Sequence, residues 1–321
     1  MQTKIRIGIL FGGQSPEHEV SILSAESVMD HLDPEKYEVL PIKIDKKGRW
    51  EKEIFSPCAL RAAFDVVFPV LHGPYGEDGT VQGLLELANI PYVGPDQLSS
   101  VLCMDKGVTK ELLSAAGLPT PQYQIFRVGD PIDMLPFPLF VKPAQMGSSV
   151  GVSKVSDREA LASAIEEAFK YSETILIEEG IEGKEIECSV MGNTDPIASL
   201  PGEVIPTHEF YSYEAKYLDE NGAHFVLPAE LSSEKREEVQ RLAIAAFKAL
   251  RCEGMARVDF FLKKDGTLLI NELNTIPGFT TISLYPKLWE VSGLPYPELL
   301  DRLIELAFER HHRKKLTPIG V

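Results

Sequence analysis

The sequence predicts an α/β protein whose N-terminal domain is built around an open parallel sheet. One observation favours this class, and a second bounds the number of domains. Strand-length apolar runs, such as residues 5–11, end in glycine turns that lead into amphipathic helices. The chain has 321 residues, which is enough for two or three domains with cores of their own. We expect three domains, at residues 1–97, 98–179 and 180–321.

The composition argues against several classes of function. The net charge of -16 argues against a nucleic-acid partner. The four cysteines lie far apart, in no paired metal-binding spacing, which indicates reduced thiols in a cytoplasm. The sequence contains neither a signal-peptide pattern nor an apolar run of membrane-spanning length. We therefore expect a cytoplasmic protein with no membrane partner.

The first domain is predicted to begin with strands at residues 5–11, 37–44 and 64–71. A short strand at residues 90–93 would follow. The loops after the first and third strands lie at carboxyl ends, where open α/β sheets bind their ligands. The first loop lacks the G-x-G-x-x-G pattern, which argues against a dinucleotide site.

Each of these two loops carries one candidate side chain. Glu17 follows a Gly-Gly turn and could hold a substrate ammonium. It could equally be an acid favoured by the dipole at the start of a helix. His72 lies among glycines and could be a general base, a ligand or a substrate contact, although an isolated histidine is more often none of these.

The second domain is predicted to be a small lid. A helix at residues 105–116 is followed by a strand at residues 137–143. Ser156 and Glu159 have the spacing of a capping box that would open a second helix. A strand at residues 174–178 would complete the unit.

This lid contains candidate phosphate contacts. The small-residue loop 147–151 could cradle phosphates with its backbone N–H groups, although a plain hairpin turn is the simpler interpretation. Lys142, at the end of the preceding strand, could reach a phosphate as a point charge. Lys106, in the first turn of a helix, could do the same or could be a solvated surface lysine.

The third domain is predicted to be rich in strands, with one long helix after Ser233. Residues 207–228 form a polar loop whose length is typical of a functional or disordered segment. Three acids near the boundary with the lid could bind ribose hydroxyls, although acidic turns are common: Glu178, Glu179 and Glu185.

The most informative stretch is a predicted hairpin at residues 257–274. Asp265-Gly266 between alternating apolar runs predicts a two-residue turn. Such a turn would place certain residues opposite one another: Arg257 and Asn274, Asp259 and Glu272, Phe261 and Ile270. The first two pairs would share one face, where two carboxylates and an amide suit a hard cation such as Mg²⁺. A solvated polar end without metal is the alternative.

Backbone donors are predicted just beyond this hairpin. Gly278 permits close approach of its N–H, which could join Arg257 in stabilising an oxyanion. Ser283 and Leu284, at the start of the next helix, could donate hydrogen bonds to a carboxylate.

Six blocks together resemble the signatures of the D-alanine–D-alanine ligases, which are ATP-grasp enzymes of peptidoglycan synthesis. They occur in order over almost the whole chain: GGQSPEHEVS (12–21), LHGPYGEDG (71–79), VKPAQMGSSVG (141–151), EAKY (214–217), ARVDF (256–260) and NELNTIPG (271–278). The resemblance implies a three-domain ATP-grasp fold and the joining of two D-alanine molecules with ATP. The reaction would pass through D-alanyl phosphate and give D-alanyl-D-alanine, ADP and phosphate.

The resemblance also implies the ATP and metal contacts. Lys106 and Lys142 would contact phosphates under a lid loop that contains Ser148, Ser149 and Val150. The adenine and ribose would meet the boundary between the second and third domains, at Glu179, Ile181 and Glu185, with Glu178 beside them. Two Mg²⁺ or Mn²⁺ ions would be bound by Asp259, Glu272 and Asn274.

The substrate contacts follow from the same resemblance. Glu17 would hold the ammonium of the first D-alanine near His72, and Arg257 with the Gly278 N–H would stabilise the oxyanion. The carboxylate of the second D-alanine would be bound by Ser283 and Leu284, with Lys216 nearby. Glu17, Ser148 and Tyr217 would form a hydrogen-bonded triad, and Tyr217 argues for a dipeptide product over D-alanyl-D-lactate. The resemblance also allows a homodimer.

Three other functions stay open at this point. The first is another ATP-grasp carboxylate–amine ligase, or a D-alanine–D-lactate ligase. The second is a regulatory protein that binds nucleotide or amino acid without turnover. The third is a phosphotransferase that stops at the acyl phosphate.

Overall fold

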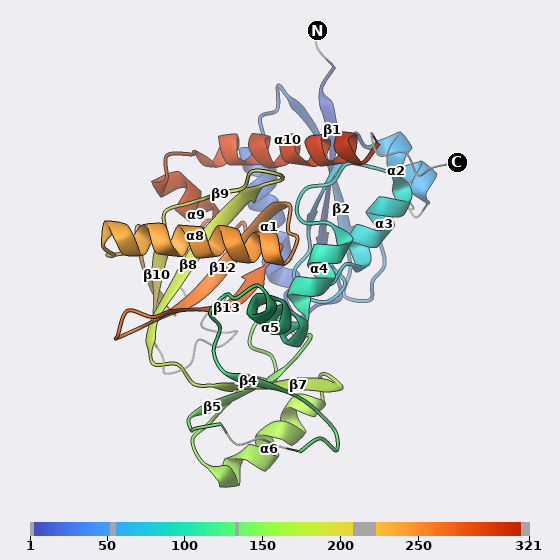
Figure 1. The fold of residues 1–321 in the computed structure, drawn as a ribbon. Helices are drawn as coiled ribbons and strands as arrows, with labels where there is room; N and C mark the ends of the chain where they lie inside the picture. Colours follow the sequence, from blue (N-terminus) through green and yellow to red (C-terminus); the bar gives the residue numbers. More distant parts are fainter. Residues whose placement is uncertain (1–2, 52–55, 132–134, 208–222, 316–321) are drawn as a thin grey trace.

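The computed structural model describes residues 3–51, 56–131, 135–207 and 223–315 (Figure 1). These residues form three separate sheets of three, four and six strands. The four-stranded sheet lies at the opposite end of the molecule from helix α10 (Figure 1). None of the helices in the described ranges is long and apolar enough to cross a membrane.

The N-terminal sheet is parallel, as predicted, and its strands have the order β2-β1-β3. Its strands and helices are β1 (Ile5–Gly12), α1 (His18–His31), β2 (Tyr37–Ile44), α2 (Pro57–Ala63), β3 (Val66–Val70) and α3 (Thr80–Ala88). The strand expected at residues 90–93 is reduced to a parallel bridge between Tyr92 and Val67. The turns after β1 and β3 therefore open at the same edge of the sheet, which brings two distant sequence blocks together.

The four-stranded sheet has the order β4-β7-β5-β6. In chain order, the elements of this part of the chain are α4 (Gln97–Met104), α5 (Lys106–Ala115), β4 (Tyr123–Arg127), β5 (Leu139–Pro143), β6 (Ser153–Val155), α6 (Arg158–Phe169) and β7 (Thr174–Glu179). Asp105 caps α5 as expected, since its side chain accepts from the Val108 N–H. The predicted capping box is wrong, because the cap of α6 is Asp157, whose carboxylate accepts from two N–H groups of the first turn.

The six-stranded sheet has the path β11-β10-β8-β12-β13, with β9 paired to β8. Its elements are β8 (Gly183–Gly192), β9 (Ile197–Ala198), β10 (Gly202–Pro206), β11 (Ala223–Val226), α8 (Ser233–Ala249), β12 (Gly254–Lys263), β13 (Leu268–Asn274), α9 (Leu284–Val291) and α10 (Tyr296–Lys315). The expectation of one long helix is wrong, because α10 has 20 residues. The end of the expected polar loop is also strand, since β11 pairs with β10.

The hairpin β12–β13 differs from the predicted one at its loop. Lys263 N–H donates to Thr267 at 2.9 Å and Gly266 N–H donates to Lys263 at 2.9 Å, which gives a loop of three residues with Gly266 at φ +86°. Phe261 therefore pairs with Leu269 and not with Ile270.

A bulge then restores the predicted pairing at the other end of this hairpin. Phe260 pairs with Ile270, but Asp259 pairs with Glu272, so Asn271 is an extra residue in β13. Arg257 consequently lies opposite Asn274, as predicted. The predicted polar face of the hairpin is therefore confirmed, although the predicted two-residue loop is wrong.

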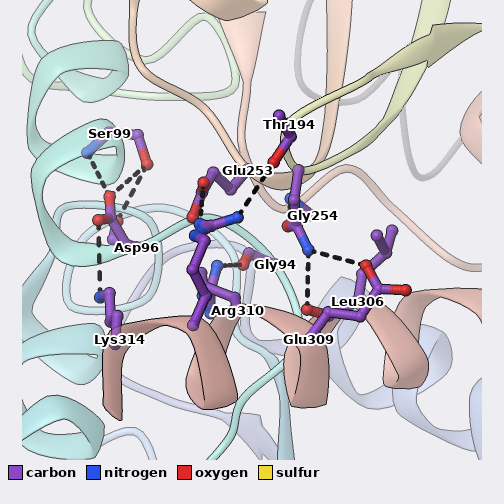
Figure 2. Close-up of polar contacts among 12 residues, drawn as sticks. Gly94, Asp96, Ser99, Thr194, Glu253, Gly254, Leu306, Glu309, Arg310 and Lys314 are labelled. Carbon is purple, nitrogen blue, oxygen red and sulfur yellow. Dashed lines mark hydrogen bonds and ion pairs between the residues drawn. The ribbon is translucent and has the colours of Figure 1, made fainter. Parts of the chain in front are cut away.

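The N-terminal and six-stranded sheets share one core. Buried residues of β1 and β3 pack with α9 and α10, and with Met191 and Met255 of the six-stranded sheet. Arg310 of α10 is 3% exposed and donates to the carbonyl oxygen of Gly94 (Figure 2). It also donates to the carbonyl oxygen of Tyr92. This shared core fixes the carboxyl end of the parallel sheet relative to the β12–β13 hairpin.

Candidate active site

A cavity of about 890 Å³ lies where the turns of the parallel sheet meet the polar face of β12 and β13. Twelve of the residues predicted from the sequence line it: Glu17, His72, Lys106, Ser148, Glu185, Arg257, Asp259, Glu272, Asn274, Gly278, Ser283 and Leu284. They come from all three sheets or the segments beside them. A cavity of this size is in the range of small-molecule and cofactor sites.

The polar face of the hairpin is crowded with charge. The Arg257 guanidinium binds both oxygens of Asp259, each at 2.8 Å, and its Nε lies 2.7 Å from Glu187 Oε2. Asn274 Nδ2 donates to Asp259 Oδ2 at 2.9 Å. Glu187, Asp259 and Glu272 lie side by side on three adjacent strands. Such adjacent carboxylates repel one another unless cations lie beside them.

Lys106 connects this face to the loop after β5. Its Nζ lies 3.7 Å from Glu272 Oε2 and donates to the Met146 carbonyl oxygen at 2.6 Å. The loop itself turns sharply, with Ser148 at φ +49° and Ser149 at φ +60°. The lysine therefore lies between a carboxylate of β13 and the loop that was predicted to cover phosphates.

A second acidic group lies at the turns of the parallel sheet. Glu17 is buried, and its Oε1 accepts a hydrogen bond from the Ser148 hydroxyl. This hydrogen bond joins the first sequence block to the loop after β5. Glu17 and Ser148 are two of the three residues of the predicted triad. A Cβ on Gly73 would lie 2.6 Å from Glu17 Oε2, so the glycine leaves room for this carboxylate.

His72 and Glu77 hold the backbone that follows β13. His72 Nδ1 lies 2.9 Å from the Ile276 carbonyl oxygen, and the Ile276 N–H donates to Glu77 Oε1 at 3.3 Å. Burial lowers the pKa of His72. Burial, followed by the nearby Glu17 carboxylate, raises the pKa of Glu77 to about 8.

The next turn presents backbone donors to the cavity. A Cβ on Gly278 would lie 2.6 Å from Ser283 Oγ, so this position has no room for a side chain. Ser283 precedes α9 but makes no side-chain cap, because its hydroxyl accepts from the Thr280 N–H at 3.0 Å. The first N–H groups of α9 are thus placed at the cavity edge, where helix dipoles favour a carboxylate.

The remaining described candidates do not line this cavity: Lys142, Ser149, Glu178, Glu179 and Ile181. Glu178 is not a solvent-facing acid. Its carboxylate is buried between two lysines, with Lys142 Nζ at 2.6 Å from Oε2. The Glu179 side chain accepts from the Gln122 N–H at 2.8 Å, so the part of Glu179 left to contact a nucleotide is its backbone. Lys216 and Tyr217 lie outside the described residues.

Two residues that line the cavity were not predicted from the sequence, Glu77 and Glu187. The buried Lys110 of α5, which does not line the cavity, was not predicted either. Glu187 alternates with Glu185 on a strand, a period-two signal that places both on one face. Lys110 follows Lys106 by four residues, which is one helical turn. Glu77 had no signal beyond its place in the glycine-rich block.

Comparison with known families gives matches over most of the chain. A family model described as D-ala D-ala ligase N-terminus matches residues 6–62 and 55–95. A second, described as D-ala D-ala ligase C-terminus, matches residues 112–305.

Individual proteins agree with these models. The D-alanine–D-alanine ligase of Solibacter usitatus is 51% identical over 322 residues, covering 98% of this chain and 98% of the relative. The solved D-alanine–D-alanine ligase from Coxiella burnetii has a TM-score of 0.87 at 41% identity, covering 98% and 96% of the two chains. The ligase from Bacillus anthracis complexed with ATP has a TM-score of 0.82 at 34% identity, covering 97% and 99%.

Proposed function

The chain belongs to the D-alanine–D-alanine ligase family, with its ATP-grasp fold, and we propose that the cavity between its sheets is where the ligation takes place. The protein is an ATP-dependent ligase that joins two D-alanine molecules in the synthesis of peptidoglycan precursors. The roles of individual residues follow as proposals from the geometry. We also propose domains at residues 1–97, 98–179 and 180–321, a cytoplasmic location and a homodimer.

The first D-alanine is placed with its ammonium at Glu17. This carboxylate is buried at the carboxyl end of the parallel sheet and is oriented by the Ser148 hydroxyl. His72 lies beside it on the neighbouring turn. The carboxylate of D-alanine would then point toward Arg257, across the cavity.

The triphosphate is placed between the loop after β5 and the β12–β13 face. Lys106 lies between these two surfaces, and Lys142 lies at the end of β5. Both would neutralise phosphate oxygens as point charges. The ribose would reach Glu185, and the adenine edge would meet the backbone of Glu179 and Ile181.

The donor set on the hairpin fits hard cations. Asp259 and Glu272 are directly opposed, with the Asn274 amide beside them. Among the described residues, no group of three or more histidine, cysteine or acidic side chains is arranged to hold a metal ion by itself, so the phosphates of ATP would have to supply the remaining oxygens. Two Mg²⁺ ions bound there would neutralise the charge of the transferring phosphoryl group.

The chemistry has two steps. A carboxylate oxygen of the first D-alanine attacks the γ-phosphorus and ADP leaves, which gives D-alanyl phosphate. The amine of the second D-alanine then attacks the acyl carbon, loses a proton, and expels phosphate. Arg257 and the Gly278 N–H would stabilise the oxyanion that forms after the amine attacks and before phosphate is expelled. Ser283 and the N–H of Leu284 would bind the carboxylate of the second D-alanine.

One observation carries this assignment: a single cavity brings Glu17 and Ser148 together with Arg257, Asp259 and Glu272. The test is phosphate release with ATP and Mg²⁺ in the presence of D-alanine, L-alanine or D-lactate. Of the three compounds, we expect only D-alanine to cause phosphate release, and we expect one dipeptide to form for each phosphate released. Release without dipeptide would indicate a phosphotransferase, and no D-alanine-dependent release would refute the proposal.

A further inference from the structure

Lys110 is a buried cation that has no role in the reaction described above. It lies on α5, one turn beyond Lys106, and is 2% exposed. Its Nζ forms an ion pair with Glu178 Oε1 and lies 3.4 Å from the Ile270 carbonyl oxygen. Burying an ammonium is costly, so a lysine in this position needs compensation from these partners.

The carboxylate that compensates Lys110 is shared with a second lysine. Glu178 Oε2 accepts from Lys142 Nζ at 2.6 Å, while Oε1 is taken by Lys110. One carboxylate thus serves two lysines, and with both lysines protonated the three side chains carry one net positive charge. Burial lowers the pKa of Lys110, while the Glu178 carboxylate opposes that effect and favours the charged form. If Lys110 were absent, Glu178 would pair with Lys142 alone and the cluster would be neutral.

Lys142 is the most exposed member of this cluster. The Lys142 side chain is 13% exposed, whereas those of Lys110 and Glu178 are each 2% exposed. Burial acts to lower the pKa of Lys142, but the Glu178 carboxylate together with Glu272 and Glu185 outweighs burial, so that the pKa is raised. Lys142 therefore keeps its charge near the end of β5, just before the loop that lines the cavity at Met146, Gly147 and Ser148.

Lys110 also reaches the strand that carries a proposed metal ligand. Ile270 immediately precedes the bulged Asn271, and Glu272 follows. Lys106 lies 3.7 Å from Glu272. One face of α5 therefore presents two lysines to β13.

We propose that Lys110 is a positioning residue of the ATP site: it takes one oxygen of Glu178, and so leaves Lys142 with charge available to the phosphates of ATP. Its contact with Ile270 keeps this lysine pair in register with β13. The inference rests on the proposed placement of the triphosphate.

The test is Lys110→Met, measured by steady-state kinetics with ATP and D-alanine varied separately. We expect the KM for ATP to rise by about tenfold or more, because a tenfold change matches the loss of one partly buried charge interaction. The KM values for D-alanine should change by less than about twofold, and raised ionic strength should weaken ATP binding less than in the wild type. Lys110→Arg should recover most of the ATP affinity, because it restores the charge.

The matched control is Lys170→Met. Lys170 is exposed at the C-cap of α6, in the same part of the chain, and pairs only with the nearby Glu167 among the ion pairs of the described residues. Its loss should leave the KM for ATP unchanged. If Lys110→Met does not fold, Lys110→Gln decides, since the amide can still hydrogen bond to Glu178 and Ile270 but carries no charge.

Two outcomes would overturn the inference. One is a KM for ATP within about twofold of the wild type in a folded Lys110 variant. The other is an equal rise in the KM values for ATP and D-alanine, which would indicate that Lys110 has only a structural role. Lys142→Met separates this failure from that of the proposed function. If Lys142→Met binds ATP normally, the phosphate assignment is wrong; if it does not while Lys110→Met does, only the role of Lys110 is wrong.

Discussion

Asp259 and Glu272 lie directly opposite each other on β12 and β13, although the loop between these strands has three residues and not two. The extra loop residue shifts the pairing by one, and the bulge at Asn271 shifts it back. A bulge also increases local twist, which turns the last residues of β13 toward the cavity. The two carboxylates therefore meet at the place where phosphates and cations would be held.

The Glu272→Gln variant tests this pair directly. Removing one charge from the opposed carboxylates should lower Mn²⁺ occupancy in the presence of a nonhydrolysable ATP analogue. Turnover should fall by about a hundredfold or more, because cation charge stabilisation supplies several kcal/mol. Circular dichroism should be unchanged. Asp265→Asn, in the exposed loop of the same hairpin, is the control, and near-normal turnover in Glu272→Gln would refute the metal assignment.

The Gly278→Ala variant tests the backbone donor. The new Cβ would lie 2.6 Å from Ser283 Oγ, so the Ser283 hydroxyl must move, which disturbs its hydrogen bond with the Thr280 N–H. We expect a fall in kcat of about tenfold to a hundredfold, since donors to a developing oxyanion must be well placed. Gly83→Ala is the control, because its Cβ would meet only the end of the Gln97 side chain, at 3.3 Å. An unchanged kcat for Gly278→Ala would exclude a role for this turn.

The buried Glu77 should make stability fall as pH rises. Burial and Glu17 raise the pKa of Glu77 to about 8, so the folded chain keeps a proton that the unfolded chain has already released. The free energy of unfolding attributed to this group is therefore fully present at low pH and is lost between about pH 4.5 and 8.

Glu77→Gln should flatten this dependence, because the amide keeps its acceptor oxygen but does not titrate. Urea unfolding at intervals from pH 5 to 8 measures the effect. The exposed Glu237→Gln is the control and should follow the wild type. Parallel curves for wild type and Glu77→Gln would show that Glu77 ionises in the folded protein as it does in the unfolded chain.

Much of this site could be predicted because its residues lie in local patterns. The hairpin face followed from alternation, and the Asp105 cap followed from residue type. The bulge at Asn271 could not be predicted, because a bulge reflects packing of the whole strand. Lys110 was missed because its partner Glu178 is 68 residues further along the chain, and no local pattern records that contact. The length of α10 could not be predicted because its buried face packs against β1 and β3, which are distant in the sequence.

The contact of α10 with residues 92–94 should matter for stability and not for catalysis. Arg310→Met would leave two buried carbonyl oxygens without their guanidinium donor and would remove its stacking on Tyr92 at 4.4 Å. We expect a loss of about 2–4 kcal/mol in the free energy of unfolding. Arg302→Met, on the exposed face of the same helix, should cost less than about 1 kcal/mol.

Thermal unfolding and KM values together check this prediction. The KM values for ATP and D-alanine should stay near those of the wild type in both arginine variants, since neither side chain lines the cavity. Equal stability of the two variants would contradict the role assigned to Arg310 in joining the sheets.

The most direct test of the central claim follows oxygen atoms through the reaction. D-alanine carrying ¹⁸O in its carboxylate is incubated with unlabelled ATP and Mg²⁺, and the released phosphate is examined by mass spectrometry. Because the carboxylate attacks the γ-phosphorus and the amine later displaces phosphate at the acyl carbon, one labelled oxygen should appear in each phosphate for each dipeptide formed. Dipeptide accompanied by unlabelled phosphate would contradict the acyl-phosphate route and the arrangement of residues proposed to support it.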